Sequence, residues 1–98
     1  MVIQQSIDQL SEQFTKKLAA DGYLETLTRT WEPNQLVATH SHPFDAHALV
    51  LEGEFTLSWN GQSQLLRKGD TFTLAAGCEH VEQYGPEGAT YLVGRRQV

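Results

Sequence analysis

The apolar and polar positions of this chain follow two different periods, and the change between them falls near residue 22. From residue 6 to residue 20, apolar side chains recur at spacings of three and four. These apolar residues are Ile7, Leu10, Phe14 and Leu18. The spacing places them in one stripe on an α-helix, so we expect a helix that packs against the domain body or a partner subunit. Ser6 with Gln9 has the form of a capping box at its start, and Asp21-Gly22 predicts its end.

After residue 22, short apolar or alternating segments are separated by turn signals, a pattern typical of an all-β sandwich or barrel. The clearest turn signal is Asn60-Gly61, which predicts a type I′ hairpin. The expected strands are 23–31, 36–40, 49–51, 54–59, 62–66, 71–74, 80–84 and 89–93, with a last turn at 85–88. We therefore expect one domain, in which residues 1–22 form an N-terminal helix and residues 23–98 a β-barrel.

Charge and composition narrow the choice of partners and of compartment. The formal net charge is −5 at pH 7, and the few basic residues are scattered, so we expect neither nucleic acid nor a membrane surface as a partner. No apolar run approaches the length of a membrane span, and residues 1–5 lack the start of a secretory signal. A single cysteine suits a reducing compartment. These features favour a cytoplasmic protein.

All four histidines lie in two short segments, and this clustering suggests a metal site. His40, His42 and His47 belong to the first segment, and His80 to the second. Neutral imidazole is a good ligand for first-row transition metals. On a strand, His40 and His42 would point to one face because side chains alternate with a period of two, and His80 could join them from the second segment.

These segments strongly resemble the two motifs of the cupin superfamily, whose members form a small β-barrel of jelly-roll type. His40-x-His42 with Gly53 matches the first motif, and Gly69, Gly77 and His80 match the second in register. The first motif usually supplies an acidic ligand as well. Counting back from Gly53, that position falls on Ala46, which has no ligand atom, and His47 is the next residue. A shift of one residue reverses the face of a strand, so His47 either reaches the cavity through a bulge or points away from it.

The second motif also predicts a polar row in the cavity. If His80 points inward, Glu82 and Tyr84 lie on the same face. Glu82 could accept a proton, orient a water or steady a ligand histidine, and Tyr84 could donate a hydrogen bond to a bound oxygen. They are the candidate catalytic residues, although Glu82 at an open rim would be merely solvated.

The resemblance implies a divalent transition metal ion (Fe, Mn, Ni, Cu or Zn) held by His40, His42, His80 and, through a bulge, His47. It also implies a small-molecule ligand in the barrel and chemistry of the dioxygenase or isomerase kind. A non-catalytic ligand- or metal-binding module and a metal-free structural barrel are the alternatives. A small barrel exposes edge strands that a second copy can cover, so we expect a homodimer.

Overall fold

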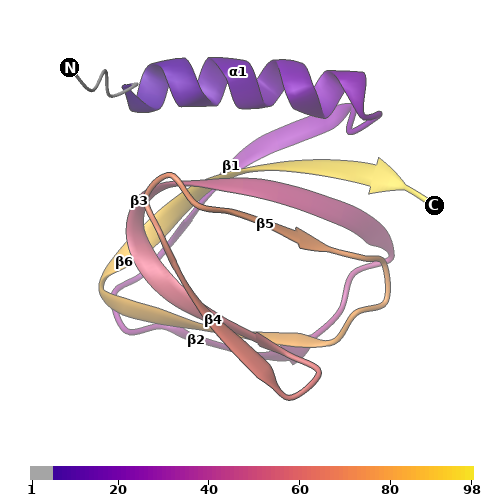
Figure 1. Ribbon diagram of the computed structural model, residues 1–98. Helices are drawn as coiled ribbons and strands as arrows, with labels where there is room; N and C mark the ends of the chain where they lie inside the picture. Colours follow the sequence, from indigo (N-terminus) through magenta and orange to yellow (C-terminus); the bar gives the residue numbers. More distant parts are fainter. Residues whose placement is uncertain (1–5) are drawn as a thin grey trace.

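One helix and six strands make up the computed structural model, which describes residues 6–98 (Figure 1). In chain order they are α1 (Ile7–Ala20), β1 (Glu25–Trp31), β2 (Leu36–His40), β3 (Phe44–Trp59), β4 (Gln62–Arg67), β5 (Thr71–Leu74) and β6 (His80–Gln97). The capping box is confirmed, because Ser6 Oγ accepts from the Gln9 amide at 3.2 Å while the Gln9 side chain accepts from the Ser6 amide at 3.0 Å. No helix within residues 6–98 is long and apolar enough to cross a membrane.

The fold is a roll built on two long, bent strands, β3 and β6, which pair with each other along most of their length. Toward one end, β1 lies beside β6 and β5 beside β3; toward the other, β2 lies beside β6 and β4 beside β3. All pairs are antiparallel. The prediction of an all-β barrel with one N-terminal helix is confirmed.

Two expected breaks between strands are absent, because β3 and β6 bend there and continue. Residues 49–51 and 54–59 belong to the single strand β3, and residues 80–84 and 89–93 belong to β6. The predicted turn at 85–88 is instead a bulge within β6. Gly53 pairs with Ala89 and Phe55 pairs with Tyr84, so residues 85–88 of β6 lie opposite a single residue of β3. Such irregularities let one strand serve both faces of the roll.

Two glycines make this bend possible. Gly53 and Gly88 have positive φ angles of 73° and 68°. A Cβ on Gly53 would lie 2.1 Å from the carbonyl oxygen of Gly88, and a Cβ on Gly88 would lie 2.3 Å from that of Trp31. Both residues therefore need the left-handed backbone conformation and the absence of a side chain.

Apolar side chains are divided between the interior of the roll and its outer face. The interior cluster includes Phe55, Leu57, Leu66, Phe72 and Tyr84. On the outside, Phe14 and Leu18 of α1 pack with Tyr23 and Leu49. The apolar stripe of the helix therefore covers the body of the domain, one of the two arrangements that the sequence left open.

Candidate metal centre

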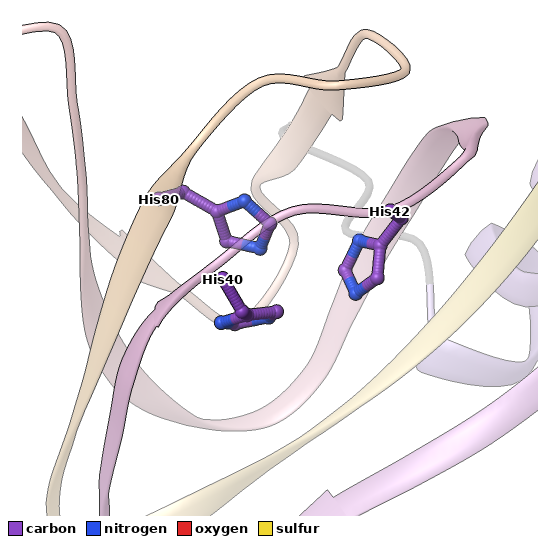
Figure 2. A group of neighbouring side chains, drawn as sticks. All are labelled: His40, His42 and His80. Carbon is purple, nitrogen blue, oxygen red and sulfur yellow. The ribbon is translucent and has the colours of Figure 1, made fainter.

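Three histidines point toward one another at one end of the roll (Figure 2). His40 ends β2 and His80 begins β6, and the two are direct cross-strand partners. His42 lies just past β2, where its carbonyl oxygen accepts a hydrogen bond of 2.8 Å from the Gly77 amide. One potential ligand atom from each ring lies within 4.8 Å of the others. The two histidine segments of the sequence are thus brought to one place, as predicted.

Backbone carbonyls determine which ring nitrogen faces the centre of this group. Nδ1 of His40 lies 2.8 Å from the carbonyl oxygen of Ala38, and Nδ1 of His80 lies 3.0 Å from that of Cys78. Because a carbonyl only accepts, both Nδ1 atoms carry the proton, and Nε2 of a neutral ring presents a lone pair. A hydrogen bond of this kind orients a metal-binding histidine and sets its tautomer.

His80 also has an unsatisfied polar atom. Its Nε2 is the only buried side-chain nitrogen or oxygen without a hydrogen-bond partner among residues 6–98. A buried polar atom without a partner costs free energy, so such atoms usually mark a site that binds water or an ion. Together with the tautomer, this atom shows that the three-histidine group fits a transition metal ion.

His42 completes the group from a different environment. Its ring stacks on Phe44 at 4.9 Å between centroids. Burial lowers the pKa of His42, and His80, His40, Arg95 and Arg29 lower it further by charge repulsion. The lowered pKa favours the neutral imidazole, which is the form that binds a metal.

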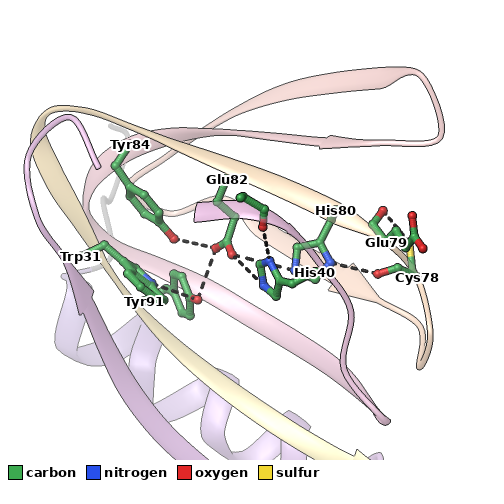
Figure 3. Close-up of polar contacts among 9 residues, drawn as sticks. Trp31, His40, Cys78, Glu79, His80, Glu82, Tyr84 and Tyr91 are labelled. Atoms are coloured by element: carbon green, nitrogen blue, oxygen red, sulfur yellow. Dashed lines mark hydrogen bonds and ion pairs between the residues drawn. The ribbon is translucent and has the colours of Figure 1, made fainter. Parts of the chain in front are cut away.

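Glu82 lies deep in the same cavity and links the histidines to a row of aromatic donors (Figure 3). The residue is only 4% exposed. Its Oε1 accepts hydrogen bonds from the hydroxyls of Tyr84 at 2.6 Å and Tyr91 at 3.4 Å. Its Oε2 lies 3.5 Å from His40 Nε2 and 3.8 Å from His80 Nε2. One carboxylate oxygen is thus held by the barrel, and the other faces the histidines.

The two tyrosines that hold Glu82 remain hydrogen-bond donors over the whole useful pH range. Burial, followed by the charges of Tyr91 and Glu82, raises the pKa of Tyr84 far above its ordinary value. Burial likewise raises the pKa of Tyr91 to about 12. Tyr91 is itself held by Trp31, whose Nε1 donates to the Tyr91 hydroxyl at 3.1 Å. The row from His80 to Tyr84 faces inward as the alternation predicted, whereas the contributions of Trp31 and Tyr91 were not foreseen.

His47 lies away from this group, so the structure does not bring the expected fourth ligand to the site. Its ring packs edge-on against Phe14 at 4.8 Å and lies 5.8 Å from that of Tyr23, on the outer face under α1. The reason is register: residues 46–49 pair with β6 without interruption, and the irregularity comes only after Val50. Without a bulge at residue 46, Ala46 faces the cavity and His47 must face outward.

The cavity beside the histidines has a mixed lining that includes two cations we did not predict from the sequence. Arg29 and Arg95 line it together with His42, His80, Glu82 and several apolar side chains. Its empty volume is about 390 Å³ including the open mouth. Arg29 could have been found from the pattern Leu27-Arg29-Trp31, which alternates with threonines and therefore shares one face of β1.

A family model described as a cupin domain matches residues 27–92. No curated protein matches the chain significantly. Among solved structures, an RmlC-like cupin from Shewanella frigidimarina NCIMB 400 is similar at 20% identity and a TM-score of 0.66, over 74% of this chain and 65% of that one.

Two further solved structures are named as KdgF from Halomonas sp. and DMSP lyase DddQ from Ruegeria pomeroyi DSS-3. KdgF is 17% identical with a TM-score of 0.63, over 74% of this chain and 68% of that one. DddQ is 21% identical with a TM-score of 0.68, over 72% of this chain but only 36% of that one. At these identities the likeness shows a shared fold and no more.

Proposed function

This chain belongs to the cupin family, and on that premise we propose that it is a metal-dependent enzyme acting on a small molecule in the barrel. The observation that carries the proposal is the convergence of His40, His42 and His80, with a buried His80 Nε2 that has no partner. These three residues would hold a divalent transition metal ion. Three imidazoles leave coordination positions open for a substrate or water, which a structural site does not.

When bound, the metal would act as a Lewis acid or as a site for oxygen, the chemistry of isomerase-like or dioxygenase-like enzymes. The residues of the chain have separate tasks. The carbonyls of Ala38 and Cys78 keep the Nε2 lone pairs of His40 and His80 turned inward. Glu82 is the group suited to accept or return a proton, because its Oε2 faces the histidines.

Tyr84 and Tyr91 fix the position of that carboxylate. Both hydroxyls reach Oε1 of Glu82 and leave Oε2 to face the cavity. Tyr84 is a positioning residue in this scheme, since its hydroxyl is engaged by Glu82 and the residue is only 1% exposed. From the sequence we expected Tyr84 to donate to a bound oxygen, but its hydroxyl donates to the Glu82 carboxylate instead.

The proposal is tested by metal content, measured by elemental mass spectrometry after reconstitution with Fe, Mn, Ni, Cu and Zn in turn. We expect about one metal ion per chain in the wild type and none retained in His80→Ala. His47→Gln is the matched control, because it removes an imidazole that lies outside the group, and it should retain the metal. A wild type that retains no metal would contradict the proposal.

A second measurement separates an enzyme from a binding module. In the Mn-loaded protein, the relaxation of solvent water reports whether the metal keeps a position open to exchange. Rapidly exchanging water supports the enzyme. A metal with no exchangeable water would assign the chain to the non-catalytic binding alternative.

A further inference from the structure

Two arginines, Arg29 and Arg95, face the inside of the barrel and line the cavity beside the histidines. In β1, Leu27 and Trp31 pack against the interior cluster, and Arg29 lies between them in the same alternating row. In β6, Arg95 continues the inward row of Tyr91 and Val93. Charged side chains are rarely placed on an inward-facing row unless they are paired or bind something.

The two guanidinium groups differ in their partners among the described residues: Arg95 has an acidic partner and Arg29 has none. Arg95 is engaged at the rim, where its Nη1 donates to Glu25 at 3.1 Å. Within residues 6–98, Arg29 has no ion pair and no side-chain hydrogen bond, and its guanidinium carbon lies 4.8 Å from the centre of the Trp31 ring. Stacking on the ring orients the plane of Arg29 while leaving the N–H groups at its edge free to donate.

The charge of the cavity points to the class of ligand. Glu82 is the only acidic residue among those that line it, and its Oε1 is occupied by two tyrosines. Arg29 and Arg95 contribute two positive charges, and a divalent ion at the histidines would add two more. The whole chain carries −5, so this cavity is a positive region within an acidic protein.

We infer that the substrate is a small organic carboxylate, whose carboxylate group is bound by Arg29 with support from Arg95. The inference rests on the proposed function, because the remainder of the ligand would extend toward His42 and His80. A guanidinium and a carboxylate form a flat bidentate pair, and packing against the Trp31 ring holds Arg29 in a position to present its edge to such a group.

The test uses two pairs of probes that differ in charge but hardly in shape: lactate with lactamide, and malonate with malonamide. Their affinities are measured by calorimetry on the Zn-loaded and the metal-free protein. We expect at least one acid to bind roughly tenfold more tightly than its amide, since a charge-assisted contact is worth about that factor. In the metal-free protein, Arg29→Gln should abolish this preference, while Arg29→Lys should retain part of it.

Arg67→Gln is the matched control, because Arg67 lies on β4, outside the cavity, and pairs with Glu54 at 3.4 Å. It should bind the probes like the wild type. Equal affinity for acids and amides, or equal loss in Arg29→Gln and Arg67→Gln, would overturn the inference. Inorganic phosphate binding more tightly than either acid would also overturn it, in favour of a phosphate ligand.

Failure of the inference and failure of the proposed function give different results. Metal retention without a preference for acids contradicts the inference alone. An acid preference in the metal-free protein that Arg29→Gln abolishes supports the anion site even if no metal is retained, and in that case only the metal-dependent function fails.

Discussion

Tyr84→Phe removes one hydroxyl from the interior and tests how the Glu82 carboxylate is held. The phenyl ring would keep its place, because the Tyr84 ring stacks on Phe55 at 4.9 Å and on Trp31 at 5.5 Å. The hydroxyl makes one short hydrogen bond of 2.6 Å to Glu82 Oε1. After the substitution, that oxygen would keep only the longer contact of 3.4 Å from Tyr91.

The magnitude follows from the charge of the acceptor. A hydrogen bond to a charged group contributes about 1.5–3 kcal/mol, so we expect the free energy of unfolding of the metal-free protein to fall by about 2 kcal/mol. For a domain of this size that loss corresponds to roughly 8–16 °C in Tm. Chemical denaturation in chelator, followed by tryptophan fluorescence, measures the free energy, and calorimetry measures the Tm.

The same substitution in a Glu82→Gln variant tests whether the charge of Glu82 causes the loss of stability. In Glu82→Gln the acceptor is neutral, so the same Tyr84→Phe change should cost only about 1 kcal/mol. The reasoning would be refuted if Tyr84→Phe lost less than about 0.5 kcal/mol, or if the loss were equal in both backgrounds.

Four further predictions concern the helix, the histidine that packs under it, the missing acidic ligand and association. Leu18→Ala should lower the free energy of unfolding by about 2–5 kcal/mol in denaturant titrations, because Leu18 is fully buried between α1 and the strands that the helix covers. A loss below about 1 kcal/mol would contradict this packing. Burial and then the charge of Lys17 lower the pKa of His47 in the folded protein below its ordinary value of 6.5. The unfolded chain therefore binds the proton more readily than the folded protein, so the free energy of unfolding falls as the pH drops below 6.5. His47→Gln should make that fall shallower, and an unchanged pH profile of Tm would refute this. Ala46→Glu supplies a carboxylate to the cavity and should raise Zn affinity about tenfold in competition titrations; unchanged affinity would count against the site. Sedimentation should give the mass of a dimer, and the mass of one chain at micromolar concentration would refute the homodimer.

The sequence predicted those parts of the fold that depend only on residues close together in the chain. The helix and its capping box are confirmed, and Asn60-Gly61 has the two positive φ angles, 48° and 75°, of a type I′ turn. The inward row from His80 to Tyr84 is also as predicted, because alternation within one uninterrupted stretch needs no knowledge of the partner strand.

The failures arise where pairing between distant strands decides the outcome. Whether His47 faced the cavity depended on where β3 was irregular, and only its register with β6 places the irregularity after Val50. Residues 85–88 contain Gly, Pro and Gly, which suit a turn and a bulged strand equally well. Arg29 enters the site only because β1 lies beside β6, with Arg29 opposite Tyr91.

The most direct test of the central claim is a crystal structure of the protein loaded with Zn, with anomalous data collected at the zinc absorption edge. The account predicts one strong peak per chain, within coordination distance of His40, His42 and His80, and none at His47. A peak at His47 or elsewhere on the surface, or no peak near the three histidines, would contradict it.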